Sequence, residues 1–145
     1  MKKIKLYTDG SSLGNPGAGG WCALLKYKNH QKILKGGKKH TTNNEMELKA
    51  VLEGLKAIKE PAQVSIYTDS RYVANGITKW IHNWANNNWK NSKKKDIEHK
   101  HIWQNIYNLL KTHKIDVTWI KAHSGHKENE ICDTIAKQEA KKFQK

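Results

Sequence analysis

Two short segments of nearly the same sequence constrain most strongly what this chain can fold into. Residues 6–11 read Leu-Tyr-Thr-Asp-Gly-Ser, and residues 66–70 read Ile-Tyr-Thr-Asp-Ser. Such apolar and β-prone residues before an acid are typical of a β-strand that ends at an aspartate. If the two strands are parallel neighbours, Asp9 and Asp69 lie side by side beyond the carboxyl ends of the strands, where open α/β sheets bind their ligands.

The other apolar patterns predict hairpin-connected strands first and then strands that alternate with helices. Expected strands lie at 3–8, 21–27, 31–41, 64–68 and 115–120, and expected helices at 43–60, 71–77, 102–112 and 128–143. The five glycines between Gly10 and Gly20 predict a loop there. This order predicts an α/β fold with a mixed five-stranded sheet flanked by helices.

Length and charge narrow the class of protein further. The 145 residues suffice for one domain, and 27 Lys plus Arg against 13 Asp plus Glu give a net charge of +14. This excess favours a polyanionic partner, either nucleic acid or an anionic membrane. No 18-residue apolar run exists, and Cys22 and Cys132 form no disulfide framework, so we expect no membrane span and a cytoplasmic location.

Acidic residues are scarce, and four of them fall where they can meet. Asp9 and Asp69 end strands, while Glu47 and Asp133 lie in the first turns of two expected helices. Gathered carboxylates repel each other and need a cation, and all-oxygen ligands suit Mg²⁺ or Mn²⁺. In a basic chain the cluster indicates a metal-assisted phosphodiester site. Taken singly, the aspartates at strand ends are also typical turn formers, and the two acids on helices also complement helix N-termini.

Two histidines lie on an expected loop at 121–128, shortly before Asp133. His123 is suited to shuttle a proton near bound metals, whereas His126 is expected to bond within its own loop. A zinc site made of His123, His126, Cys132 and Asp133 is an alternative, although its spacing fits no standard structural zinc pattern.

Five motifs spread over essentially the whole chain are similar to those of one family. They are Tyr-Thr-Asp-Gly-Ser-Ser-Leu-Gly-Asn-Pro-Gly at 7–17, Thr-Thr-Asn-Asn-Glu-Met-Glu-Leu at 41–48, Tyr-Thr-Asp-Ser-Arg-Tyr-Val at 67–73, Trp-Ile-His-Asn-Trp at 80–84, and His-Ser-Gly-His-Lys-Glu-Asn-Glu-Ile-Cys-Asp at 123–133. In these motifs and their order the chain resembles the bacterial type I ribonuclease H family.

The resemblance implies a ribonuclease H-like fold in a single catalytic domain, residues 1–145, with a basic helix-loop protrusion at 79–101. It implies a monomeric endonuclease that hydrolyses the RNA strand of RNA–DNA hybrids and leaves 3′-hydroxyl and 5′-phosphate ends. Two divalent ions, Mg²⁺ with Mn²⁺ as a substitute, would serve each active site together with substrate.

The resemblance also assigns residues to roles. The matching metal-binding carboxylates are Asp9, Glu47, Asp69 and Asp133, and His123 matches a loop histidine that assists proton movement or product release. The matching contacts to the hybrid are Gly10, Ser11, Asn43 and Asn44 for the RNA strand, Asn15 and Thr42 for a DNA phosphate, and Trp80, Trp84, Lys93, Lys94 and Lys95 in the protrusion. We expect Trp89 and Trp103 to pack the small core of the protrusion instead.

Two positions depart from the pattern of the family. Arg71 stands where members often have glutamine, and His40 stands where an arginine often flanks the phosphate pocket. Three rival functions remain: a nuclease for structured DNA, a hybrid-binding module without catalysis, and a membrane-surface protein. The five motifs argue against the first and the four carboxylates against the second. A membrane-surface protein needs a long helix that pairs a lysine face with an apolar one, and the sequence predicts no such helix.

Overall fold

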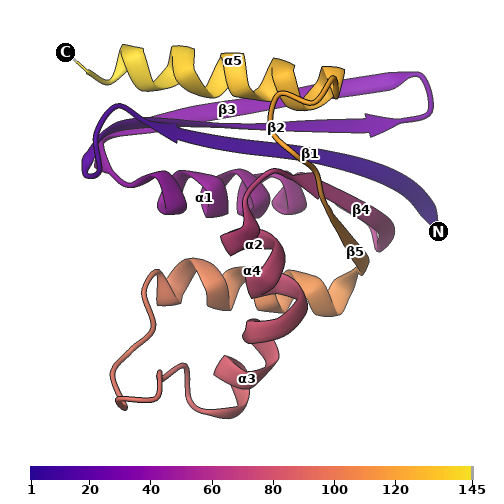
Figure 1. The fold of residues 1–145 in the computed structure, drawn as a ribbon. Helices are drawn as coiled ribbons and strands as arrows, with labels where there is room; N and C mark the ends of the chain where they lie inside the picture. The colour runs from indigo at the N-terminus through magenta and orange to yellow at the C-terminus, as the bar shows by residue number, and fades with distance from the viewer. Residues whose placement is uncertain (145) are drawn as a thin grey trace.

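The computed structural model describes residues 1–144, in which one five-stranded sheet separates two layers of helices (Figure 1). The elements follow in the order β1 (Lys2–Ser12), β2 (Gly17–Tyr27), β3 (His30–Thr41), α1 (Asn43–Lys56), β4 (Ala62–Thr68), α2 (Arg71–Asn75), a π-helical turn η1 (Gly76–Trp80), α3 (Ile81–Asn86), α4 (Lys100–Thr112), β5 (Lys114–Trp119) and α5 (Lys127–Lys142). Helix α5 covers one face of the sheet, and α1 and α4 lie on the other side (Figure 1).

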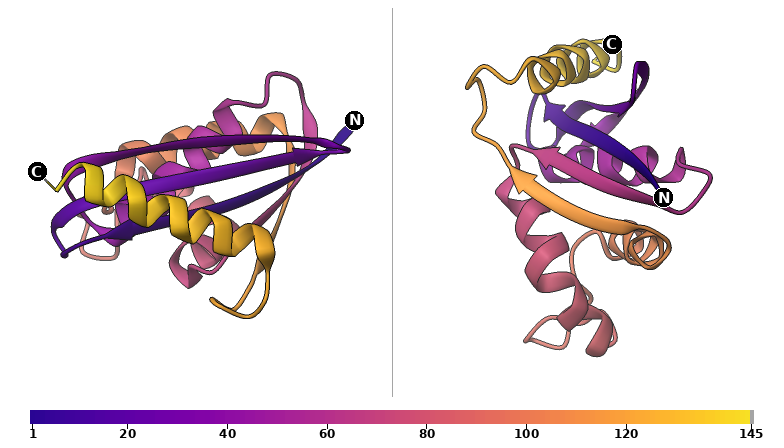
Figure 2. Two further views of the ribbon diagram at one scale, coloured as in Figure 1. Left: turned by 90° about the horizontal axis from the view of Figure 1, so that it is seen from above. Right: turned by 90° about the vertical axis from the view of Figure 1, so that its right-hand side faces the viewer.

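The sheet has the mixed topology that the sequence predicts. Its strand order is β3-β2-β1-β4-β5, in which β1, β2 and β3 pair antiparallel, whereas β4 is parallel to both β1 and β5. The arrows of β1, β4 and β5 point the same way in the right-hand view of Figure 2. The carboxyl ends of these three strands therefore meet at one edge of the sheet.

The predicted glycine loop at 10–20 is wrong. Strands β1 and β2 continue into it, with Gly10 opposite Trp21 and Ser12 opposite Gly19, so that only residues 13–16 turn. The glycines here mark close packing rather than a turn, because a Cβ on Gly20 would lie 2.5 Å from the Ala140 backbone nitrogen in α5. The other strands and helices lie near their predicted positions, except that α1 ends at Lys56 instead of residue 60.

Two hydrophobic clusters hold the layers together. The larger one lies between the sheet and helices α1 and α4, where Leu6 and Ile66 of the sheet are fully buried with Leu48 and Trp103. The smaller one lies under α5 and joins Tyr7 to Cys132 and Ala136. Burial on both faces is expected for a sheet whose central strands are covered by helices.

Residues 79–101 project from the larger layer as α3 and the segment that leads into α4 (Figure 1). Their aromatic side chains pack in a row: Trp80 lies against Trp84, and Trp84 lies edge-on against Trp103. The Trp103 indole is fully buried and donates a hydrogen bond of 3.0 Å to the Tyr72 hydroxyl. Trp89 is half-buried against Tyr107, so both tryptophans that were expected to pack the protrusion do so.

Within the part of the chain that the structure describes, no helix has the length and apolar character that crossing a bilayer requires.

Gly76 offers a test of this packing. A Cβ at this buried position would overlap the Trp103 ring, whose Cζ2 atom would lie 2.6 Å away. We expect Gly76→Ala to lower the free energy of unfolding by about 1–3 kcal/mol, because overpacking outweighs the better helix propensity of alanine. Asn75→Ala, one residue earlier and half-exposed, is the control and should be nearly neutral. Equal stability of both variants in urea denaturation would contradict this account of the packing.

Candidate active site: a carboxylate cluster at the ends of β1 and β4

Three carboxylates from separate parts of the chain meet at the carboxyl ends of the parallel strands. Asp9 lies in β1, Glu47 lies in the first turns of α1, and Asp69 directly follows β4. One carboxylate oxygen from each lies within 4.8 Å of the other two. Asp9 and Glu47 are only 3% and 4% exposed, so this concentration of negative charge sits largely out of water.

The sequence around each acid explains how it reaches the cluster. Parallel pairing sets Tyr7 of β1 opposite Tyr67 of β4, two residues before each aspartate, and the two tyrosine rings stack 4.7 Å apart. Glycine follows Asp9 because α1 approaches there: a Cβ on Gly10 would overlap the backbone of Glu47, whose Cα would lie 2.9 Å away. The small residue thus brings the start of α1 against the end of β1.

The start of α1 is fixed by its cap. The Thr42 hydroxyl accepts a hydrogen bond of 3.2 Å from the Glu45 backbone N–H, which is the contact typical of a helix N-cap. The Glu45 carboxylate does not return to Thr42 but accepts from the Thr41 hydroxyl and from Lys38 Nζ at 3.1 Å. These bonds tie the first turn of α1 to the end of β3 and so orient Glu47.

Burial and mutual repulsion raise the pKa values of all three acids. Burial, followed by the charges of Asp69 and Asp133, raises the pKa of Asp9 to about 8, although the Gly10 N–H donates to Asp9 Oδ1 at 3.0 Å. Burial and the neighbouring aspartates raise the pKa of Glu47 well above its ordinary value. Burial, with the charge of Asp133, also raises the pKa of Asp69. The site therefore holds more negative charge than its surroundings balance.

Two oxygens of the cluster have no partner among residues 1–144. Asp9 Oδ2 and Glu47 Oε1 are buried and accept no hydrogen bond from the described chain. Buried polar atoms are almost always paired, and carboxylate oxygens are the ligands that Mg²⁺ and Mn²⁺ prefer. The residues present therefore fit a divalent cation.

The fourth predicted carboxylate, Asp133, lies beside this group on α5. It is close enough to raise the pKa values of Asp9 and Asp69, and its own Oδ2 pairs with Lys137 Nζ at 3.1 Å. Asn129, which the sequence patterns did not single out, is 3% exposed and lies close enough to Asp69 to oppose the rise of the Asp69 pKa. Its spacing of four residues from Asp133, which places both on one face of a helix, was the available signal.

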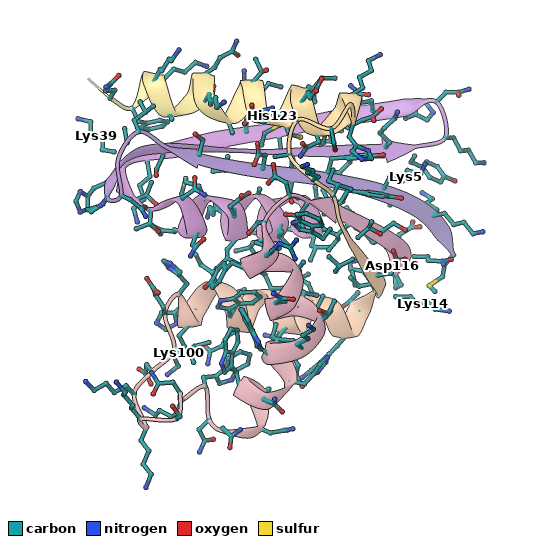
Figure 3. The ribbon with its side chains drawn as sticks, viewed as in Figure 1. Lys5, Lys39, Lys100, Lys114, Asp116 and His123 are labelled. Carbon is teal, nitrogen blue, oxygen red and sulfur yellow. The ribbon has the colours of Figure 1, made fainter. Side chains whose placement is uncertain are left out.

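His123 is exposed on the loop between β5 and α5 (Figure 3). It lies near enough to Asp69 for its charge to oppose the rise of that pKa. The zinc alternative is wrong: in residues 1–144 only Asp9, Glu47 and Asp69 form a group of three or more potential metal ligands. The Cys132 thiol instead lies buried against Cys22 Sγ at 3.5 Å. In the described chain the exposed His126 side chain makes no capping hydrogen bond, contrary to the expectation that it bonds its loop.

The residues matched to nucleic-acid contacts line the approaches to the cluster. Gly10 and Ser11 follow Asp9 on β1, while Thr42, Asn43 and Asn44 form the start of α1. The Asn15 side chain accepts a hydrogen bond of 3.1 Å from the Asn43 backbone N–H, which joins the turn after β1 to this start.

The protrusion holds the other matched residues. Trp80 is 38% exposed and Trp84 is half-buried. The Asn91 side-chain oxygen Oδ1 accepts hydrogen bonds from the backbone N–H groups of Lys93 and Lys95, at 2.9 and 3.1 Å. This turn leaves the side chains of Lys93, Lys94 and Lys95 in solvent, as a phosphate contact needs.

Known proteins are similar to this chain in sequence. A model of the RNase H family matches residues 1–141. Ribonuclease HI of Haemophilus influenzae is 52% identical over 139 residues, 96% of this chain and 90% of the relative. Ribonuclease H of Campylobacter concisus is 51% identical over 143 residues, 99% and 96% of the two chains.

Solved structures agree with these relatives. The structure of LC9-RNase H1, described as a type 1 RNase H with the type 2 active-site motif, has a TM-score of 0.89 at 30% identity and covers all of this chain and 74% of that one. The PFV RNase H domain has a TM-score of 0.77 at 29% identity and covers 97% and 96% of the two chains. The chain therefore belongs to the RNase H family, in its bacterial type I branch, and is an endoribonuclease.

The raised pKa of Asp9 predicts a specific pH dependence of stability without metal. Folding favours the protonated acid, so the contribution of this group to stability is full below about pH 4 and is lost as pH rises through about 8. In EDTA at pH 8.5, Asp9→Asn should raise the free energy of unfolding by about 1–3 kcal/mol. The difference from wild type should shrink towards pH 5.

Asp116→Asn is the matched control, because Asp116 is exposed on β5 and accepts a hydrogen bond from the Ser65 hydroxyl that asparagine preserves. Its stability should follow the wild type at every pH. A destabilised Asp9→Asn protein at pH 8.5 in urea titrations would contradict the crowded-carboxylate interpretation.

Proposed function

We propose that this protein hydrolyses the RNA strand of RNA–DNA hybrids and leaves 3′-hydroxyl and 5′-phosphate ends. The observation that carries the proposal is the largely buried cluster of Asp9, Glu47 and Asp69, in which two oxygens have no partner among residues 1–144, in a chain of net charge +14. The net positive charge favours a polyanionic substrate, and the cluster supplies a site for a cation. The relatives named ribonuclease H support this substrate.

Asp9, Glu47, Asp69 and Asp133 would hold the metal. When bound there, two Mg²⁺ ions, or Mn²⁺ in their place, supply activation of the attacking water and neutralisation of charge on the leaving 3′-oxygen. The chain itself contributes a site that is pre-formed by β1, α1 and β4, which limits reorganisation when substrate binds. His123, exposed beside Asp69, takes up and releases a proton at its imidazole.

Recognition of the hybrid requires groups that distinguish RNA from DNA. Gly10, Ser11, Asn43 and Asn44 stand next to the carboxylates and supply donors and acceptors for 2′-hydroxyls in the minor groove. Asn15 and Thr42, on the two joined turns, would contact a phosphate of the DNA strand. The protrusion, with Trp80, Trp84 and the Lys93, Lys94 and Lys95 run, would grip the duplex farther from the cluster.

We infer that residues 1–145 act as one catalytic domain. A monomeric state and a location in the cytoplasm stay predictions from the sequence.

Asp69→Asn tests the metal role of the cluster. Removing one ligand charge should lower the rate of hybrid cleavage in Mg²⁺ by more than roughly 10³-fold while the fold persists, because the charge balance at the phosphate depends on every ligand. The measurement is cleavage of a strand-labelled RNA–DNA hybrid, with duplex DNA as a second substrate. Asp116→Asn, far from the cluster, should retain the wild-type rate. Near-normal activity of Asp69→Asn would refute the assignment, and preferential cleavage of duplex DNA would favour a DNA nuclease.

Replacing Lys93, Lys94 and Lys95 together with alanine tests the protrusion. Each lost phosphate contact should reduce the slope of log affinity against log salt by nearly one unit, so hybrid binding in EDTA should weaken and lose salt dependence. The rate of cleavage at saturating substrate should change little.

A matched triple replacement of Lys3, Lys5 and Lys114 is the control. Lys5 and Lys114 lie on the other side of the molecule from Lys100, which lies in the protrusion at the start of α4 (Figure 3). The slope of log affinity against log salt for this control variant should stay close to that of the wild type. Equal slopes for both triple variants would show that the protrusion lysines only add general charge.

A further inference from the structure

Asp69 differs from the two other cluster acids in how its backbone is held. Asp9 lies inside β1, paired with Cys22 of β2, and Glu47 lies inside α1. Asp69 lies between the end of β4 and the start of α2, outside both elements. Its position therefore depends on how the strand-to-helix turn itself is fixed.

Side chains and the neighbouring strand fix this turn almost completely. The Thr68 carbonyl accepts a hydrogen bond of 2.9 Å from the Ile120 N–H, and the Ser70 carbonyl accepts one of 3.0 Å from the Ala74 N–H. The remaining carbonyl, that of Asp69, accepts a hydrogen bond of 3.0 Å from Trp119 Nε1. Each backbone carbonyl of residues 68–70 thus has a partner, and the partner of Asp69 is a side chain fifty residues away.

Trp119 reaches this carbonyl because of its place in the sheet. It is the last residue of β5 and pairs with Thr68, the last residue of β4, so the two strand ends lie side by side (Figure 2). The indole is 38% exposed. A large apolar ring kept at the surface of an edge strand is accounted for by its N–H donor rather than by burial.

A second contact holds the indole in its orientation. The guanidinium carbon of Arg71, the only arginine in the sequence, lies 4.0 Å from the centre of the Trp119 ring. Arginine stacks flat on an aromatic face, which lysine does not do as well. Arg71 is two residues after Asp69, so the segment 69–71 grips one indole at two points, through its carbonyl and through its cation.

We propose that Trp119 is a positioning residue for the carboxylate cluster: its N–H holds the Asp69 backbone, and Arg71 keeps the ring in the donating orientation. The Asp69 carboxylate then stays at its distance from Asp9 and Glu47. The inference rests on the proposed metal role of Asp69. Partners that orient metal ligands typically change metal affinity by roughly 10–100-fold when they are lost.

Trp119→Phe tests the proposal, because it removes the N–H and keeps an aromatic ring. The affinity of the substrate-free protein for Mn²⁺ should fall by about tenfold or more. It is measured by the decrease of the electron paramagnetic resonance signal of free Mn²⁺ as the ion binds. The Mg²⁺ concentration for half-maximal cleavage should rise in parallel. Hybrid affinity in EDTA should equal that of the wild type.

Trp89→Phe is the matched control, since it makes the same change at a half-buried tryptophan of the protrusion. Its Mn²⁺ affinity should not change. Wild-type Mn²⁺ affinity in a folded Trp119→Phe protein would overturn the proposal. So would a loss of hybrid affinity in EDTA with normal Mn²⁺ binding, because the indole would then contact nucleic acid. After either outcome, cleavage of the hybrid by the wild-type protein leaves the proposed function standing. If the wild-type protein neither binds Mn²⁺ nor cleaves the hybrid, the proposed function and the role of Trp119 are both refuted.

Arg71→Leu keeps the test decisive if Trp119→Phe does not fold. Removing a positive charge beside a cation site should by itself strengthen Mn²⁺ binding. Removing the contact that holds the Trp119 ring should weaken it. The proposal requires weaker binding, with partial recovery in Arg71→Lys. Stronger Mn²⁺ binding in Arg71→Leu would show that Arg71 acts only through its charge, and it would overturn the proposal that Arg71 holds the Trp119 ring.

Discussion

Repulsion among buried carboxylates is the constraint on which the rest of this structure depends. Asp9, Glu47 and Asp69 each have a favourable place in a strand, a helix or a turn, but together they create negative charge where little water is present. The raised pKa of Asp9, to about 8, expresses that cost. The fold tolerates this unfavourable free energy because the core on both sides of the sheet anchors β1, α1 and β4.

The surrounding charge is of the opposite sign and is arranged at a distance. The chain carries a net charge of +14, yet among residues 1–144 no lysine forms an ion pair with the three carboxylates of the cluster, and Lys137 pairs with the neighbouring Asp133 instead. Lysines that entered the cluster would balance its charge and leave no reason for a metal to bind. In the proposed function, the lysines of the protrusion supply affinity for a polyanion without filling the site.

Much of this arrangement was predictable because it follows from local patterns. The repeated Tyr-Thr-Asp segments predict adjacent aspartates if their strands are parallel neighbours, and β1 and β4 do pair in parallel, with Tyr7 opposite Tyr67. The helix that was expected from residue 43 does begin at Asn43. The glycines between residues 10 and 20 misled because a glycine permits both a turn and the close approach of another backbone. Only the tertiary contacts of Gly20 with α5 decide between these.

The residues that sequence reasoning missed act through long-range contacts. Asn129 meets Asp69 across sixty residues, and Trp119 meets the Asp69 carbonyl across fifty. The spacing of four residues places Asn129 and Asp133 on one face of α5, but it does not say that this face meets Asp69. Both contacts with Asp69 depend on how β5 and α5 are placed against the end of β4.

The most direct test of the carboxylate cluster as a metal site is anomalous diffraction from crystals soaked in Mn²⁺ with a hybrid that cannot be cleaved. The account predicts two anomalous peaks bounded by Asp9, Glu47, Asp69 and Asp133. Peaks only elsewhere on the protein, with none at the ends of β1 and β4, would contradict it.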